Sequence, residues 1–150
     1  MSNLISAAID VMIVVANDPS FAQELTRQHV IENFIGWLET KDSYLLERIA
    51  VCMYHLGKSS KSIRRYIASQ PNVVAELGKS MRRTSDPFAV RELLRVLAML
   101  SANVTIVGDV ARLLKEDLLD FVHHVCGEAD DRMLQYERVL LVHVSVDSEE

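Results

Sequence analysis

The sequence repeats itself with a period of about 44 residues, and this repetition limits the folds that the chain can adopt. A shift of 44 residues relates one acidic and three apolar positions in three successive segments: Asp42, Asp86 and Asp130; Leu46, Val90 and Leu134; Met53, Leu97 and Leu141; Leu56, Leu100 and Val144. A shift of 41 residues relates an earlier segment to the first of these, through Ile5, Ile9, Met12 and Val15. Such a repeat predicts a stack of similar units, each of which buries its apolar face against its neighbours.

Each unit contains a long amphipathic helix, which is clearest in residues 86–103, DPFAVRELLRVLAMLSAN. Asp86 is a typical N-cap residue, and Pro87 suits the first helical position, where no N–H donor is needed. Apolar residues follow at spacings of three and four, with charged residues between them: Phe88, Val90, Leu93, Leu94, Leu97, Met99 and Leu100. This spacing predicts a helix whose apolar stripe must be covered by other helices.

The same periodicity predicts helices along the whole chain, and hence an all-α fold. We expect them at about 4–16, 19–27, 29–40, 44–57, 60–69, from residue 71, and at 104–114, 115–126 and 132–144. The first is apolar almost all round, so it should be buried on most sides. Gly57 and Gly127 should end helices, and Trp37 should belong to the core. The predicted units are 1–42, 43–86, 87–130 and a partial 131–146, followed by an acidic tail at 147–150.

Residues 30–74 and 73–111 resemble armadillo repeats, which alternate a helix of the pattern Ile-x-x-Leu-Val-x-Leu-Leu-x-Ser with a longer helix ending in Ala-Leu-x-Asn-Leu. The resemblance, shared with HEAT repeats, implies a right-handed α-solenoid of about three and a half repeats with three helices in each. Two positions depart from the family pattern. The glycine that precedes the second helix is replaced by His29, Pro71 and Lys115, and the asparagine near the end of the long helix by Val14, His55, Met99 and His143.

In armadillo proteins the long helices line a concave groove that holds an extended peptide or a partner helix. Transferred to this chain, the resemblance implies three rows of groove residues, with Asp10 and Val14 added from the first unit: Glu47, Arg91 and Gln135; Val51, Arg95 and Val139; His55, Met99 and His143. Arg91 and Arg95 lie one helical turn apart, so together they could bind one acidic or phosphorylated group. The alternative is that they pair with Glu92 or with acids of a neighbouring unit.

A basic stretch interrupts an otherwise acidic chain. Residues 57–108 carry nine Lys and Arg against three acids, although the net charge of the chain is −5. The members of this basic patch outside the central helix are Lys58, Lys61, Arg64, Arg65, Lys79, Arg82 and Arg83. They could bind phosphate, nucleic acid or an anionic lipid, but only Tyr66 lies among them, and the acidic balance disfavours nucleic acid. Ser85 follows Arg82-Arg83-Thr84 and is a candidate phosphorylation site beside the positive end of the central helix.

No catalytic or cofactor signature is present in the sequence, such as a glycine-rich phosphate loop or a nucleophile elbow. Cys52 with His55, and His123 with Cys126, have the spacing of metal-ligand pairs, but core packing of helices produces the same spacing and the pairs lie more than one repeat apart. We therefore expect no enzyme activity, no metal and no cofactor. Cysteines inside helical runs favour a reducing compartment, the cytoplasm or the nucleus, and no stretch is long and apolar enough to span a membrane.

The sequence thus predicts a non-enzymatic scaffold or adaptor that binds a protein partner, a peptide or a helix, in the groove. Two alternatives remain open. Apolar residues near the ends of the solenoid, such as Leu4, Val11 and Val146, could instead be covered by another copy of the chain, which would make it an oligomerisation module. The basic middle third could bind an anionic surface or, with less support, a nucleic acid.

Overall fold

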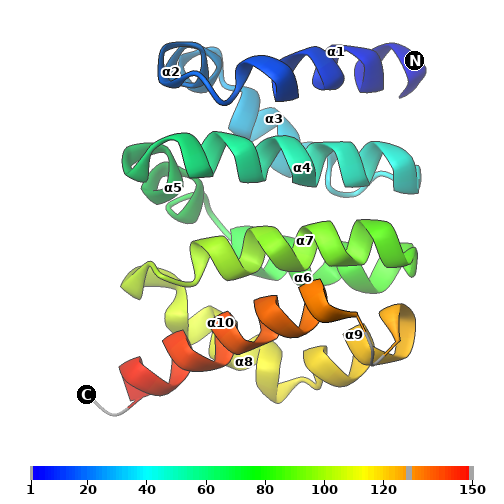
Figure 1. Cartoon of the computed structure of the whole chain (residues 1–150), viewed down its shortest axis with the longest axis vertical. Helices are drawn as coiled ribbons and strands as arrows, with labels where there is room; N and C mark the ends of the chain where they lie inside the picture. Colours follow the sequence, from blue (N-terminus) through cyan, green and yellow to red (C-terminus); the bar gives the residue numbers. More distant parts are fainter. Residues whose placement is uncertain (1, 128–129, 149–150) are drawn as a thin grey trace.

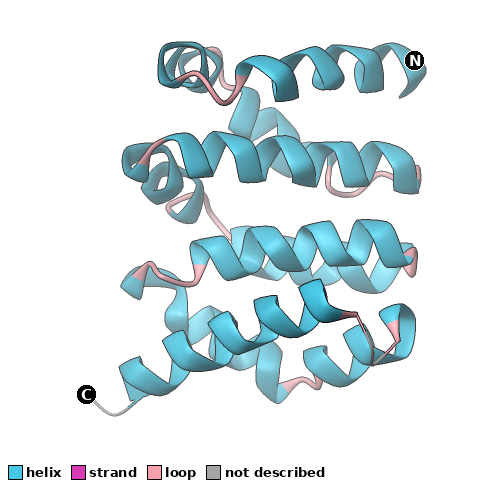
Figure 2. Cartoon of the chain, in the orientation of Figure 1, coloured by secondary structure: helices cyan, strands magenta, loops and turns pink. Residues whose placement is uncertain are grey.

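The computed structural model describes residues 2–127 and 130–148, and every regular element in these ranges is a helix (Figure 1 and Figure 2). The prediction of an all-α fold is therefore confirmed. Within the described ranges, ten α-helices and one 3₁₀ helix follow one another: α1 (Ser2–Val15), α2 (Pro19–Arg27), α3 (Val30–Trp37), α4 (Ser43–Ser59), α5 (Lys61–Ala68), α6 (Val73–Thr84), α7 (Pro87–Leu100), η1 (Val104–Ile106), α8 (Val107–Lys115), α9 (Leu118–Cys126) and α10 (Asp131–Ser148).

Four helices, α1, α4, α7 and α10, lie side by side in one row, and each packs against the next (Figure 1). The other helices pack against this row: α2 and α3 against α4, α5 and α6 against α7, α9 against α7 and α8 against α10. The two ends of the chain lie at opposite ends of the row (Figure 1). As a result, α4 and α7 have a row neighbour on both sides, whereas α1 and α10 have one in the described part of the chain.

The aspartates of the 44-residue repeat cap three of the row helices. The Asp42 carboxylate accepts from Leu45 N at 3.1 Å, and that of Asp86 accepts from Phe88 N and Ala89 N at 2.9 and 3.2 Å. Asp130 accepts from Met133 N at 3.0 Å. These bonds satisfy N–H groups that have no partner within the helix, so each aspartate fixes where its helix begins. The cap predicted at Asp86 is confirmed, and the aspartates equivalent to it in the repeat, Asp42 and Asp130, cap their helices in the same way.

A left-handed residue precedes α3, α6 and α9. These three residues are, in order, His29, Asn72 and Asp117, with φ of 62°, 59° and 62°. Glycine takes this conformation most easily, and Asn and Asp tolerate it better than most other residues. Of the three positions that the sequence comparison singles out before these helices, only His29 is the left-handed residue; in the other two cases it is Asn72 and Asp117 rather than Pro71 and Lys115. The helices expected to begin at those two residues begin later, at Val73 and Leu118.

The sequence predicts that Gly57 ends its helix, but α4 continues to Ser59. A Cβ atom at Gly57 would lie 2.4 Å from Met99 Cε and 2.7 Å from Met99 Sδ. The glycine therefore serves the close approach of α4 and α7 rather than a helix stop. Gly127, with φ of 82°, does end α9 as predicted.

Burial depends on the place of a helix in the row as well as on its sequence. The first helix is predicted to be buried on most sides, but Leu4, Val11 and Val14 are 75%, 65% and 76% exposed, since within the described residues α1 has a row neighbour on one side only. Leu141 shares its register with the buried Leu97 and is expected to be core. It is 47% exposed, because α10 is the last described helix of the row.

Two aromatic residues expected to be buried are exposed. The Trp37 ring stands on the outer side of α3, with its centroid 6.0 Å from that of Phe34. Phe88 lies in the first turn of α7, and a helical side chain leans toward the N-terminus, so its ring projects beyond the covered part of the helix. The prediction that Trp37 belongs to the core is wrong.

The last helix is longer than its apolar pattern predicts and ends at Ser148, inside the expected acidic tail. Residues 149 and 150 of that tail lie outside the described residues. No helix in the described ranges has by itself the length and apolarity to cross a membrane, and α7 with the segment Val104–Lys115 would pass that test only as a pair bent by 119°.

Candidate functional site

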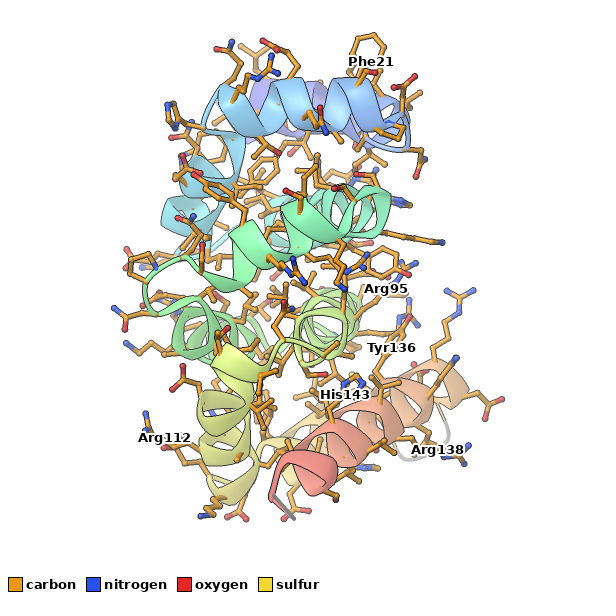
Figure 3. The ribbon with its side chains drawn as sticks, turned by 90° about the vertical axis from the view of Figure 1, so that its left-hand side faces the viewer. Phe21, Arg95, Arg112, Tyr136, Arg138 and His143 are labelled. Atoms are coloured by element: carbon orange, nitrogen blue, oxygen red, sulfur yellow. The ribbon has the colours of Figure 1, made fainter. Side chains whose placement is uncertain are left out.

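A hollow of about 250 Å³ opens on the side of the row formed by α4, α7 and α10. Its lining combines two tyrosines, one cation, one amide and three apolar side chains: Tyr54, Arg95, Ala98, Met99, Gln135, Tyr136 and Val139. Arg95 and Tyr136 lie on the same side of the molecule in Figure 3. Four of the predicted groove residues therefore meet here, Arg95, Met99, Gln135 and Val139, and the structure adds Tyr54, Ala98 and Tyr136.

Arg95 stands between an aromatic ring and a carboxylate. Its guanidinium carbon lies 3.5 Å from the centroid of the Tyr54 ring, and its Nη1 donates to Glu92 Oε2 at 3.3 Å. Burial lowers the pKa of Arg95, but the hydrogen bond with Tyr54 and the charge of Glu92 outweigh this effect and raise it. Arg95 is therefore a fixed cation on the wall of the hollow. Sequence reasoning missed Tyr54 because it is one residue away from the predicted rows.

Arg91 binds a different carboxylate. Its Nη1 lies 3.4 Å from Asp130 Oδ2, and its guanidinium carbon lies 5.4 Å from the Phe88 ring centroid. A backbone hydrogen bond from Met133 is the main reason that the pKa of Asp130 is lowered, and Arg91 acts in the same direction. Each of the two arginines thus has its own acid, one from α7 and one from the start of α10, as the alternative interpretation predicts.

The third predicted groove row connects neighbouring helices. His55 Nδ1 lies 3.2 Å from Asn17 Oδ1, next to the end of α1, and Met99 packs on Gly57 in the last turn of α4. His143 Nδ1 lies 2.7 Å from Ser101 Oγ, at the end of α7. The side chain at this position therefore contacts the C-terminal end of the preceding row helix in three successive cases. Its main role is in helix packing, which the groove prediction does not include.

The Ser101–His143 pair has the two groups of a nucleophile and its base, but its geometry does not suit catalysis. Ser101 is 1% exposed, and its hydroxyl donates to the Ala98 carbonyl oxygen at 2.7 Å. The Ser101 proton is thus directed at the Ala98 carbonyl oxygen and not at His143. The pair fixes α10 against α7.

Glu47 and Val51, the remaining predicted groove residues, are half-buried on α4 and do not line the hollow. Burial raises the pKa of Glu47, and the nearby acids Glu92 and Asp86 act in the same direction. Asp10, predicted for the first unit, accepts from Arg48 Nε at 2.7 Å and so joins α1 to α4.

The basic patch is divided between two places. One group lies on the last turn of α4 and on α5: Lys58, Lys61, Arg64 and Arg65. The other group lies on α6, which connects to α7 at the opposite end of the row helices (Figure 1): Lys79, Arg82 and Arg83. Arg64 donates to the Gly57 carbonyl at 3.1 Å and Arg82 to that of Glu116 at 2.7 Å. The basic residues therefore form two separate groups, one near each end of the row helices.

Ser85 is exposed in the turn before α7, with φ of 53°. The first N–H groups of α7 are already bonded to Asp86. A phosphate on Ser85 would meet this carboxylate before any free N–H group, so the helix end offers it less stabilisation than the sequence suggests.

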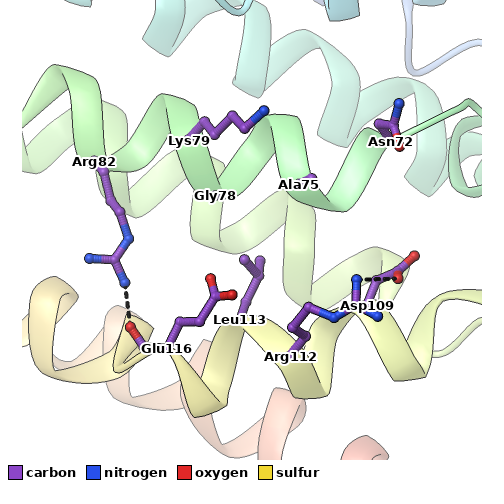
Figure 4. Close-up of a pocket in the computed structure, with 9 residues that line it drawn as sticks. All are labelled: Asn72, Ala75, Gly78, Lys79, Arg82, Asp109, Arg112, Leu113 and Glu116. Carbon is purple, nitrogen blue, oxygen red and sulfur yellow. Dashed lines mark hydrogen bonds and ion pairs between the residues drawn. The ribbon is translucent and has the colours of Figure 1, made fainter.

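A second hollow, of about 310 Å³, lies between α6 and α8 (Figure 4). It is lined by Asn72, Ala75, Gly78, Lys79, Arg82, Asp109, Arg112, Leu113 and Glu116. Arg112 lies 3.7 Å from Asp109, and Arg82 is bonded to the backbone of Glu116. The lining carries three cations and two carboxylates, and Arg112 pairs with Asp109, so the hollow has both signs of charge and only a small excess of positive charge.

No group of three or more His, Cys, Asp and Glu that could hold a metal ion occurs among the described residues. Cys52 is a buried residue of α4, and Cys126 Sγ lies 3.6 Å from the Pro87 carbonyl oxygen. The two cysteines lie on different helices, and both are free thiols.

Cys52 should resist thiol reagents in the folded protein. Burial raises the pKa of its thiol from 9.0 to about 12. This change lowers the thiolate fraction at pH 8 about 1,000-fold, and only the thiolate reacts. We expect Ellman's reagent to titrate Cys126 alone before denaturant is added and both cysteines afterwards. A Cys126→Ser variant should show no fast-reacting thiol, and rapid labelling of Cys52 in that variant would contradict the burial described above.

Comparisons with models of known protein families, with curated proteins and with solved structures gave no match to this chain.

Proposed function

We propose that the chain is a right-handed α-solenoid of about three and a half armadillo-like repeats that acts as a non-enzymatic protein-binding scaffold. Two recurrences support the solenoid: the aspartate caps of α4, α7 and α10 at intervals of 44 residues, and the left-handed residues before α3, α6 and α9. The packing of each row helix against the next agrees with a stack of similar units. The free cysteines support a reducing compartment such as the cytoplasm.

The observation that carries the binding function is the hollow between α4, α7 and α10. Tyr54 and Tyr136 each offer a ring and a hydroxyl, and Met99 and Val139 offer apolar surface. A mostly apolar concavity with a few fixed polar groups is the usual form of a site for an anchor side chain. The ligand of this site is a peptide or helix of another protein that inserts one apolar or aromatic residue.

Arg95 would give this contact its direction. A guanidinium has five N–H donors, and a carbonyl or carboxylate next to the anchor residue could accept from those that Glu92 does not use. A strongly acidic or phosphorylated partner has less support, because Arg91 and Arg95 already have Asp130 and Glu92 beside them. The partner is therefore apolar at its anchor and has a single acceptor nearby.

Selection of peptides from a random display library against the purified protein tests this proposal. We expect enriched peptides to share an aromatic or large aliphatic residue and to bind the Val139→Arg variant about tenfold or more weakly, since the new side chain fills the hollow. Val142→Arg is the matched control. It places the same substitution one turn along α10, at an exposed residue that does not line the hollow, and binding should be unchanged.

Two results would contradict the proposal. One is a selection that enriches no peptide, and the other is a set of peptides that bind both arginine variants as well as they bind the original chain. Peptides that share acidic runs without an apolar residue would favour the acidic-partner alternative.

A further inference from the structure

The outer side of α1 is a continuous apolar surface. Leu4, Ala7, Ala8, Val11 and Val14 are all exposed and lie along one side of the helix. The single charged residue of α1 is Asp10, which is turned toward α4 and bonded to Arg48 at 2.7 Å. The exposed aromatic residue Phe21, on α2, lies at the same end of the molecule (Figure 3). We call the five α1 residues the α1 face.

The register of the repeat shows that the equivalent side of the next row helix is covered by another helix. A shift of 41 residues carries Leu4, Val11 and Val14 to Leu45, Cys52 and His55. In α4 the corresponding side is the one that meets α1: His55 bonds Asn17 at 3.2 Å, and Leu45 and Cys52 are buried. The α1 face is thus equivalent to the side of α4 that the neighbouring row helix covers.

The absence of charged residues from the α1 face limits what can cover it. A helix that carries charged groups on its contact side would have to bury them against a surface with no charged partner, which is unfavourable. The helix at the other end of the row, α10, has such a charged outer side. It exposes Leu141 and Val142 together with Gln135 and Arg138. Stacking of α10 on α1 would therefore place the Arg138 guanidinium against an uncharged surface.

We infer that the α1 face binds the α1 face of a second copy, so that two chains form a two-fold symmetric dimer. A self-complementary pair of this kind buries only apolar side chains on both sides. The small residues Ala7 and Ala8 lie between Leu4 and Val11 and let the two helices approach closely. This contact is at the end of the row, away from the hollow between α4, α7 and α10, and so does not depend on the function proposed for that hollow.

The contact is small, which sets the strength of the dimer. With 14 residues, α1 is about 21 Å long. A single pair of such helices, even with Phe21 at its edge, covers less than the roughly 800 Å² per partner of a standard interface. The dimer should therefore dissociate in the micromolar range, at roughly tens of micromolar.

Sedimentation velocity of the full chain tests this inference. Between about 5 and about 200 µM the molecular mass should rise from 16.9 kDa toward twice that value, and the change should persist in about 0.5 M salt because no ion pair holds the contact. Val11→Glu, at the middle of the α1 face, should remain a monomer throughout. Leu4→Glu gives a second position with the same expectation. Thermal melting of the variants at about 5 µM should match the original chain, since both residues are mostly exposed there.

Two further samples distinguish this dimer from other assemblies. An equal mixture of Val11→Glu and Val11→Lys should associate although each variant alone does not, because the two opposite charges meet across the two-fold axis. Val142→Glu, on the outer side of α10, should dimerise like the original chain. A chain that stays monomeric at about 200 µM overturns the inference, and so does loss of association in both Val11→Glu and Val142→Glu, which would indicate stacking of α1 on α10.

Discussion

Replacing Leu97 with alanine is expected to lower the free energy of unfolding by about 3 kcal/mol. Leu97 is fully buried in α7, the helix that contacts α4 on one side and α10 on the other. Shortening it removes apolar contacts and leaves a cavity that packed neighbours on both sides prevent from closing. Urea denaturation followed by circular dichroism measures the change as a lower midpoint at constant slope.

Leu141→Ala is the matched control for this change. Leu141 occupies the same position of the 44-residue repeat as Leu97, on α10, but nearly half of it is exposed. The same substitution should therefore cost less than about 1 kcal/mol. Equal losses at the two positions would mean that α10 has a neighbour on its outer side in solution, or that α7 does not have a row neighbour on both sides.

Gly57→Leu is expected to destabilise the protein by about 2 kcal/mol, although leucine favours a helix more than glycine does. The space beside Gly57 is filled by Met99, whose Cε would lie 2.4 Å from an added Cβ, and Arg64 Cγ would lie 3.2 Å away. The two helices must separate or Met99 must leave its position. Thermal or urea unfolding gives the size of this effect.

Two companions show whether the loss arises from the contact with Met99. Gly36 lies in α3 with nothing within 4 Å of an added Cβ, so Gly36→Leu should be neutral or stabilising by up to about 1 kcal/mol. The double variant Gly57→Leu with Met99→Ala should lose clearly less stability than the two single changes added together, because the shortened side chain makes room for the leucine. Additive losses would mean that the clash lies elsewhere.

Four of the residues named in the groove prediction line one hollow, but the contacts of individual side chains could not be read from the sequence. Arg95, Met99, Gln135 and Val139 do line a hollow, since residues at equivalent places of neighbouring repeats lie close together. The positions of Asn17 and Ser101, which bind His55 and His143, are not visible in the repeat, because they lie at helix ends and on different residues each time. The acid with which each arginine pairs is likewise not visible in the repeat, because it depends on side-chain rotamers and on the residues of neighbouring helices.

The sequence by itself determined the all-α class, the approximate helices and the aspartate caps. These features depend on the spacing of apolar residues along one helix and on hydrogen bonds within three residues, which are local properties of the chain. Only the tertiary structure decided which apolar residues are covered. Leu97 and Leu141 have the same local sequence position, and so do Cys52 and Val11, yet one of each pair is buried and the other exposed. The difference is the presence or absence of a neighbouring helix about 40 residues away in the sequence, which no local pattern contains.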